Sequence, residues 1–188
     1  MSIPTSTSPK NSSKNSRSKL RVLGIDPGLE RTGWAVIEKE GTSDPFLVSC
    51  GLIETKAALS FPARLEVIFN TLTRTLAQHR PDEVAMEAMS FMRHSPSISA
   101  TIQARGVITL ACQLAGMHIQ AYEPKKVKLA ITGSGAAEKL QMQRMTQLML
   151  RLPAMLQPDD VADAAAIALC HAKMAPYQQK IQQALGKI

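Results

Sequence analysis

The sequence has few cysteines, no long apolar run and few acids in its central part. Its three cysteines (Cys50, Cys112 and Cys170) are odd in number, lie in apolar segments and lack metal-ligand spacing. This excludes a disulfide framework and argues against a zinc site. No apolar stretch reaches the roughly 18 residues that a membrane-spanning helix needs, and no secretory signal is visible. We therefore expect a cytoplasmic protein with reduced thiols and no membrane partner.

Acidic residues are scarce where basic residues gather. The net charge is +7, and residues 1–21 contain five cations and no acid, namely Lys10, Lys14, Arg17, Lys19 and Arg21. Between Ala88 and Pro158 there are eight cations against two acids. A one-sided excess of this kind suits contact with a nucleic-acid backbone, whereas the alternative is a solvated basic face.

Apolar residues are nearly missing from residues 1–19, which are rich in Ser, Thr, Pro, Asn and Lys. A segment of this composition cannot bury enough apolar surface to fold, so we expect a disordered basic extension there. The remaining length suits one domain, over residues 20–174, and we expect residues 175–188 to form a C-terminal tail or lid.

The order of predicted elements indicates an α/β fold. Strands are expected at 20–26, 32–38, 46–53, 83–87 and 117–122, and helices at 60–80, 95–115, 124–132, 137–152 and 159–173. Three consecutive strands followed by alternating helices and strands favour a five-stranded mixed sheet flanked by helices.

Four carboxylates stand at positions where an acid needs an explanation. Asp26 and Glu87 each end an apolar strand, and Asp160 and Asp163 are three residues apart at the start of an alanine-rich helix. Residues at this helical spacing share one face. Buried carboxylates are costly unless they pair or hold a cation, so the pattern predicts an acidic site for Mg²⁺.

Each acid also has an ordinary structural interpretation. Asp26 precedes Pro27 and Gly28 and could form a turn, and Asp159 or Asp160 could cap the last helix. Glu87 is harder to explain in this way because it has no turn to form. Taken together on different elements, the four acids favour a nuclease in which paired Mg²⁺ ions assist hydrolysis of a phosphodiester.

Six short motifs follow one another between about Leu20 and His171. They are residues 23–28 (LGIDPG), 32–37 (TGWAVI), 85–87 (AME), 103–106 (QARG), 135–139 (GAAEK) and 160–164 (DVADA). In sequence, order and spacing these motifs resemble the RuvC family of Holliday-junction resolvases. The small residues around them, including Ala162, Ala164 and Ala168, would let the last helix approach the sheet closely.

The resemblance implies a ribonuclease-H-like fold and a homodimer that makes paired nicks in a four-way DNA junction during recombination and repair. It also implies two Mg²⁺ per subunit, with Mn²⁺ as a substitute, and a branch-migration motor as partner. Asp26, Glu87, Asp160 and Asp163 match the metal-binding catalytic acids. Lys139 matches a catalytic basic residue near the scissile phosphate. The DNA-binding residues that we expect are Phe91, Arg93, Arg105, Lys125, Lys128 and Lys139.

The chain departs from the family pattern after Glu87. Ser90 stands where an aromatic residue is common, so Phe91 is expected to act as a single wedge that stacks on a base, with a core Phe as the alternative. Residues 93–102 also diverge, within the region that forms the family's dimer helix.

Three other functions fit parts of the pattern. An ATPase of the actin and sugar-kinase type would use Asp26 and Gly28 in a phosphate loop, but the chain is short and lacks a second glycine-rich loop. A junction-binding module without catalysis would not need all four acids. A related nuclease that acts on RNA has the same fold-level features.

Overall fold

The computed structural model describes residues 19–89 and 96–186. Phe91 and Arg93, two of the predicted DNA contacts, lie outside the described residues. The strands are β1 (Lys19–Asp26), β2 (Arg31–Glu40), β3 (Phe46–Glu54), β4 (Glu83–Glu87) and β5 (Ile119–Tyr122). The helices are α1 (Phe61–His79), α2 (Pro96–Leu114), α3 (Pro124–Thr132), α4 (Lys139–Met149) and α5 (Asp159–Leu185).

The five strands form one mixed sheet in the order β3-β2-β1-β4-β5. β1, β2 and β3 pair as an antiparallel meander, and β4 and β5 extend the sheet in parallel with β1. The α/β fold with a five-stranded mixed sheet, predicted from the sequence, is confirmed. β1 is therefore the central strand, and it ends beside β4.

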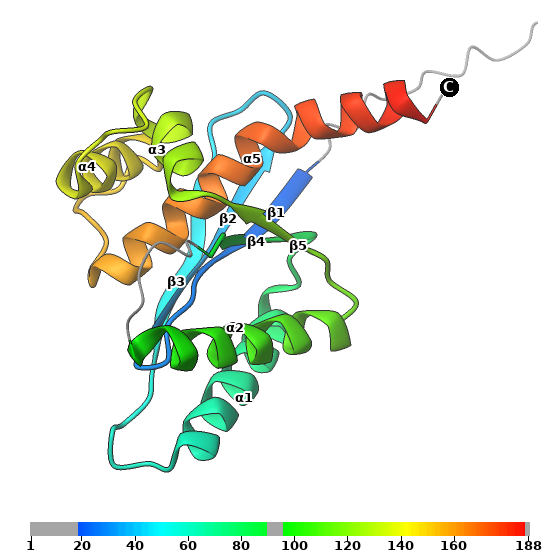
Figure 1. Cartoon of the computed structure of the whole chain (residues 1–188). Helices are drawn as coiled ribbons and strands as arrows, with labels where there is room; N and C mark the ends of the chain where they lie inside the picture. The colour runs from blue at the N-terminus through cyan, green and yellow to red at the C-terminus, as the bar shows by residue number, and fades with distance from the viewer. Residues whose placement is uncertain (1–18, 90–95, 187–188) are drawn as a thin grey trace, which may run out of the picture.

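Helices α3, α4 and α5 lie on one side of the sheet, and α1 and α2 lie on the other (Figure 1). The alternation of side chains along the strands divides the core between these two faces. Val22 of β1 and Ala85 of β4 pack with α3, α4 and α5. Leu23 and Ile25 of β1 face the other way and pack with α1 and α2. Since side chains alternate along a strand, Asp26 and Glu87 belong to the face that α5 covers.

Helix α5 lies unusually close to the sheet because glycines stand beneath it. A Cβ on Gly24 would come within 2.1 Å of the carbonyl oxygen of Ala164, and within 2.7 Å of the backbone nitrogen of Ala168. The alanines of α5 between positions 162 and 168 are fully or almost fully buried. The close approach predicted from these small residues is confirmed.

Helix boundaries differ from the prediction in two places. Helix α4 begins at Lys139 and ends at Met149, so the predicted range 137–152 was too long at both ends. Helix α5 was predicted to end near Lys173 but continues to Leu185, away from the sheet (Figure 1). Pro176 removes one backbone donor without ending the helix, and Gly186 is the next residue that favours termination. None of the described helices has the length and apolar character needed to cross a membrane.

Candidate active site

Two of the predicted acids end neighbouring strands. In the parallel pairing of β1 and β4, Ile25 is the register partner of Met86. Asp26 and Glu87 follow these partners, so both carboxylates emerge at the same edge of the sheet, on the α5 face. The two carboxyl groups lie close enough to interact, and this contact helps to raise the pKa of Asp26 while it opposes the rise in the pKa of Glu87. The sequence prediction that these two strand ends meet agrees with the geometry.

The first turn of α5 brings two further acids to this edge. Asp26 is the register partner of Gly33 in β2, and the backbone of Asp160 lies directly on Gly33. A Cβ at Gly33 would lie 2.0 Å from the carbonyl oxygen of Asp160. Asp163 follows one helical turn later, and its side chain is 35% exposed. The four acids therefore converge from β1, β4 and α5, and each of them is only partly exposed to solvent.

The electrostatics of the cluster indicate a site that requires positive charge. Burial, together with the negative charges of Glu87 and Asp163, raises the pKa of Asp26 to about 8. Burial also raises the pKa values of Glu87 and Asp163. Carboxylates gathered at this density are stabilised by a bound cation, and an all-oxygen ligand set matches the preference of Mg²⁺. The residues present thus fit a magnesium site.

Two basic side chains contact the acids on α5. Lys139 donates a short hydrogen bond to Asp159, and its Nζ lies 3.5 Å from an oxygen of Asp163. Arg31 donates to Asp160 through a short contact and to Asp159 at 3.2 Å. Within residues 19–89 and 96–186, no three His, Cys, Asp or Glu side chains adopt a formed metal-binding geometry. In this arrangement two of the four acids contact cations instead, Asp160 through Arg31 and Asp163 through Lys139.

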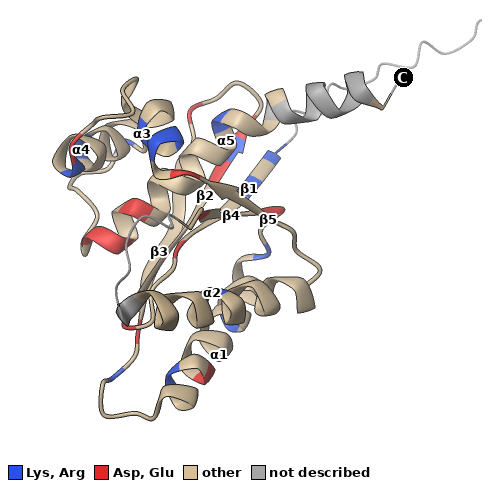
Figure 2. Cartoon of the chain, viewed as in Figure 1, with Lys and Arg blue, Asp and Glu red and all other residues tan. Residues whose placement is uncertain are grey.

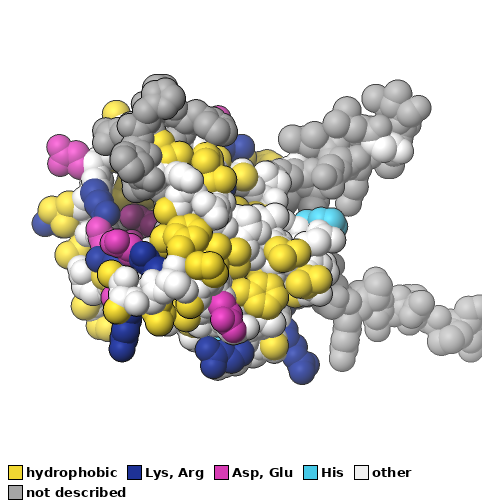
Figure 3. Space-filling model, turned by 60° about the horizontal axis from the view of Figure 1, so that its bottom comes forward, with side chains coloured by type: hydrophobic (Ala, Val, Ile, Leu, Met, Phe, Trp, Pro, Cys, Tyr) yellow, Lys and Arg dark blue, Asp and Glu magenta, His cyan; other side chains and the backbone are white. Residues whose placement is uncertain are grey.

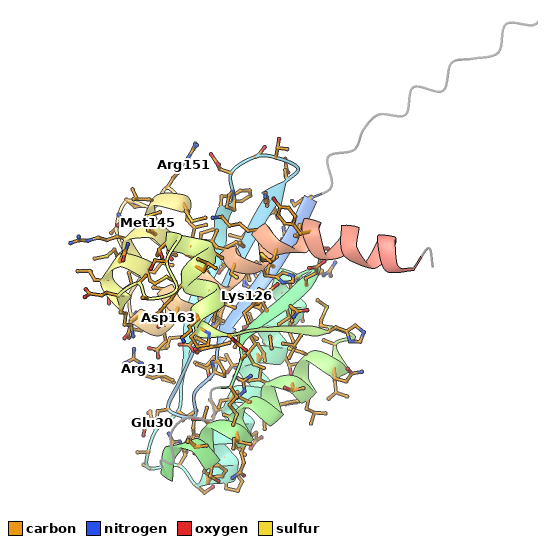
Figure 4. All side chains as sticks on the ribbon, turned by 45° about the horizontal axis from the view of Figure 1, so that its top comes forward. Glu30, Arg31, Lys126, Met145, Arg151 and Asp163 are labelled. Carbon is orange, nitrogen blue, oxygen red and sulfur yellow. The ribbon has the colours of Figure 1, made fainter. Side chains whose placement is uncertain are left out.

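Arg31 and Asp159 were missed as site residues in the sequence. Asp159 was considered only as a helix cap, and Arg31 stands at the start of β2 without a recognisable motif. The hydrogen bond between them joins residues more than a hundred positions apart, and no local sequence pattern predicts such a contact. Figure 4 shows Arg31 and Asp163 on the same side of the molecule, where the first turn of α5 meets the sheet.

Two clefts adjoin the acids, and Glu87 lines both. One, of about 220 Å³, is lined by Glu87 and Asp163 together with Lys128 and Lys139. The other, of about 190 Å³, is lined by Glu87 and by Arg105 of α2. Glu87 therefore stands between a cleft with two lysines and a cleft with one arginine.

Three of the predicted DNA contacts within the described residues line these clefts, namely Arg105, Lys128 and Lys139. Arg105 is half-buried, and burial lowers its pKa while Glu87 and Asp26 oppose that shift. Lys125 is exposed on α3, next to Lys126, whose ammonium lies over the ring of Tyr122. Figure 2 shows basic residues of α3 and α4 on the same side of the sheet as the acidic start of α5.

The sheet order, the mixed strand directions and the helix laid across an acidic sheet edge define a ribonuclease-H-like fold. The sequence profile of the family described as "Crossover junction endodeoxyribonuclease RuvC" matches residues 22–171. This chain belongs to that family, whose members are metal-dependent nucleases. The resemblance found in the sequence is confirmed.

Relatives and solved structures agree with this assignment. The crossover junction endodeoxyribonuclease RuvC of Brevibacillus brevis is 47% identical over 154 residues, which cover 82% of this chain and 92% of the relative. The structure of Thermus thermophilus RuvC has a TM-score of 0.78 at 32% identity, covering 85% of this chain and 97% of that one. The same protein in complex with a Holliday junction substrate has a TM-score of 0.79 at 32% identity, covering 83% and 94%.

Proposed function

We propose that Asp26, Glu87, Asp160 and Asp163 form the catalytic centre of this crossover junction endodeoxyribonuclease, which resolves Holliday junctions. The observation that carries the proposal is the convergence of four carboxylates at one sheet edge, with the pKa of Asp26 raised to about 8 by burial and by its neighbours. Acids in that state favour a bound divalent cation, because a cation removes the mutual repulsion. We propose two Mg²⁺ per subunit, with Mn²⁺ as a substitute.

Different residues of the chain would then bind the metal ions, stabilise charge at the scissile phosphate and hold the neighbouring phosphates. When bound, the two ions supply an activated water and neutralise charge on the leaving oxygen. Lys139, whose Nζ lies 3.5 Å from an oxygen of Asp163, would stabilise the negative charge that develops on the phosphate. Lys128, Lys125 and Arg105 would hold neighbouring phosphates of the strand. Because Glu87 lines both clefts, the strand would cross Glu87 between the lysines and the arginine.

Symmetric nicking requires two copies of this centre, and α2 offers a surface for pairing. Ile102, Leu110 and Leu114 are 45%, 52% and 69% exposed, and nothing lies within 4 Å of where a Cβ on Gly106 would be. These residues follow helical spacing along one face of α2. Figure 3 shows hydrophobic side chains gathered over the side of the molecule that α1 and α2 form. We propose a homodimer through this face, since a two-fold pair matches a junction with two equivalent strands.

Two further parts of the proposal concern the setting of the reaction. A branch-migration motor would act as partner, since resolution at defined positions requires the crossover to move. A cytoplasmic location is consistent with the three free cysteines, two of which are buried in the core.

The direct test is cleavage of a synthetic four-way junction by the purified full chain, with and without Mg²⁺. We expect paired nicks in opposed strands that require Mg²⁺, with a linear duplex of the same sequence left intact. Asp26→Asn should bind the junction and leave it uncut. Nicks that persist undiminished in Asp26→Asn would contradict the assignment of the acids.

A further inference from the structure

The first turn of α5 carries a continuous chain of alternating charge. Arg31 contacts both Asp160 and Asp159 through one terminal nitrogen, Nη2. On the other side of Asp159, Lys139 contacts Asp159 and approaches Asp163. Asp159 is thus the shared acceptor of two cations, each of which also reaches one of the proposed metal-binding acids.

The guanidinium of Arg31 can respond to a metal ion by changing its carboxylate partner. A guanidinium has five N–H donors in a rigid fork and can exchange one carboxylate for another while it keeps a hydrogen bond. Arg31 is 42% exposed and Asp159 is 42% exposed, so both can adjust without disturbing the core. Asp160 is more enclosed, at 24% exposure, and its backbone is fixed on Gly33.

We propose that Arg31 pairs with the Asp160 carboxylate in the metal-free protein and thereby competes with a metal ion for it. When a divalent ion binds Asp160, Arg31 moves away and keeps its contact with Asp159, which serves as its anchor. This inference rests on the proposed function, because it requires the acids of α5 to be metal ligands. Arg31 is therefore a positioning residue that competes with the metal, and Asp159 keeps the displaced guanidinium at the edge of the site. Asp159 also holds Lys139 beside Asp163 in the same way.

The arrangement has a consequence for substrate binding. Once withdrawn to Asp159, the Arg31 guanidinium has N–H groups free to meet a phosphate oxygen. A strand that supplies that oxygen stabilises the displaced position of Arg31. By thermodynamic linkage, a bound strand then raises the affinity for the metal, and the metal raises the affinity for the strand.

Calorimetric titration of the metal-free full chain with Mn²⁺, without DNA, tests the competition. Arg31→Gln should bind Mn²⁺ at least about threefold more tightly than the natural chain, as loss of a partly exposed ion pair predicts. Arg151→Gln is the matched control, because it removes a guanidinium paired with Asp44 away from the acids. It should bind Mn²⁺ as the natural chain does.

The outcomes separate this inference from the proposed function. If the natural chain binds Mn²⁺ and Arg31→Gln binds it equally or less tightly, the competition is overturned while the metal site stands. If the natural chain binds no Mn²⁺, the metal site fails and the inference fails with it.

The guanidinium N–H signals of Arg31 in nuclear magnetic resonance distinguish direct displacement from a distant charge effect. The signals are assigned by their loss in Arg31→Gln. Saturating Mg²⁺ should change their chemical shifts to new values that still differ from those of free arginine. In Asp159→Asn, the chemical shifts with Mg²⁺ bound should equal those of free arginine. Chemical shifts that do not change with Mg²⁺ would overturn the proposed displacement of Arg31. Free-arginine values in the natural chain with Mg²⁺ would overturn the role of Asp159 as the anchor.

Discussion

Gly33 lies directly beneath Asp160, so closely that a Cβ on Gly33 would come 2.0 Å from the Asp160 carbonyl oxygen. Gly33 is also the register partner of Asp26. One glycine therefore sets the distance between an acid on β1 and an acid on α5. The absence of a side chain at position 33 is what allows the helix to deliver its carboxylates to the strand ends.

Gly33→Ala is expected to impair metal binding, because the methyl group must push the first turn of α5 away from the sheet. We expect Mn²⁺ affinity to fall at least about tenfold and stability to fall by about 1–3 kcal/mol, as overpacking generally costs. Calorimetric titration and thermal unfolding measure both quantities. Gly135→Ala is the control, since its Cβ would make only an ordinary contact, 3.5 Å from the carbonyl oxygen of Lys125. A Gly33→Ala chain with unchanged Mn²⁺ affinity would contradict the role given to this glycine.

Asp26→Asn is expected to stabilise the metal-free protein at pH 8 while it removes activity. The folded-state pKa of Asp26, about 8, lies above its ordinary value of 3.8. The folded protein therefore binds the proton more tightly than the unfolded chain, and stability falls as pH rises between about 4 and about 8.

Thermal unfolding in a chelator at pH 5, 6.5 and 8 checks this dependence. Relative to the natural chain, Asp26→Asn should gain roughly 1–3 kcal/mol at pH 8, less than the full shift because Glu87 shares the titration. The variant should gain little stability at pH 5, and added Mg²⁺ should restore the stability that the natural chain loses at pH 8. If the natural chain has the same melting temperature at pH 5 and pH 8, the raised pKa of Asp26 is contradicted.

The positions that escaped sequence analysis share a physical cause. Asp26 and Glu87 were predictable because an acid at the end of an apolar strand lies at a known edge of the sheet, and the alternation of side chains sets the face to which it points. Arg31 and Asp159 were not, since an exposed charge in sequence does not report a partner more than a hundred residues away. The extension of α5 past Pro176 was missed because one lost hydrogen bond does not end a helix whose flanking residues favour it.

Leu110→Glu is expected to separate the proposed homodimer. A charge placed on the apolar face of α2 would have to be buried at the interface, which costs several kcal/mol when it is unpaired. Sedimentation or gel filtration should show a monomer that stays folded. Leu148→Glu is the matched control, because Leu148 is 67% exposed on α4. Equal behaviour of the two variants would place the interface elsewhere.

Lys128→Ala is expected to weaken junction binding and make it less dependent on salt. Loss of one phosphate contact lowers the magnitude of the slope of log affinity against log salt by about 1. Binding titrations at several salt concentrations, without Mg²⁺, measure this slope. Lys173→Ala is the comparison, since the Lys173 ammonium donates to the backbone of Ala130 instead. An unchanged slope for Lys128→Ala would remove this lysine from the DNA path.

The most direct measurement is diffraction from crystals of the full chain soaked in Mn²⁺, recorded at the manganese absorption edge. We expect anomalous peaks at direct ligand distance from the carboxylate oxygens of Asp26, Glu87, Asp160 and Asp163. We also expect Arg31 to have left Asp160 for Asp159. Crystals that bind Mn²⁺ elsewhere, or hold none between these acids, would contradict the assignment of these acids as metal ligands.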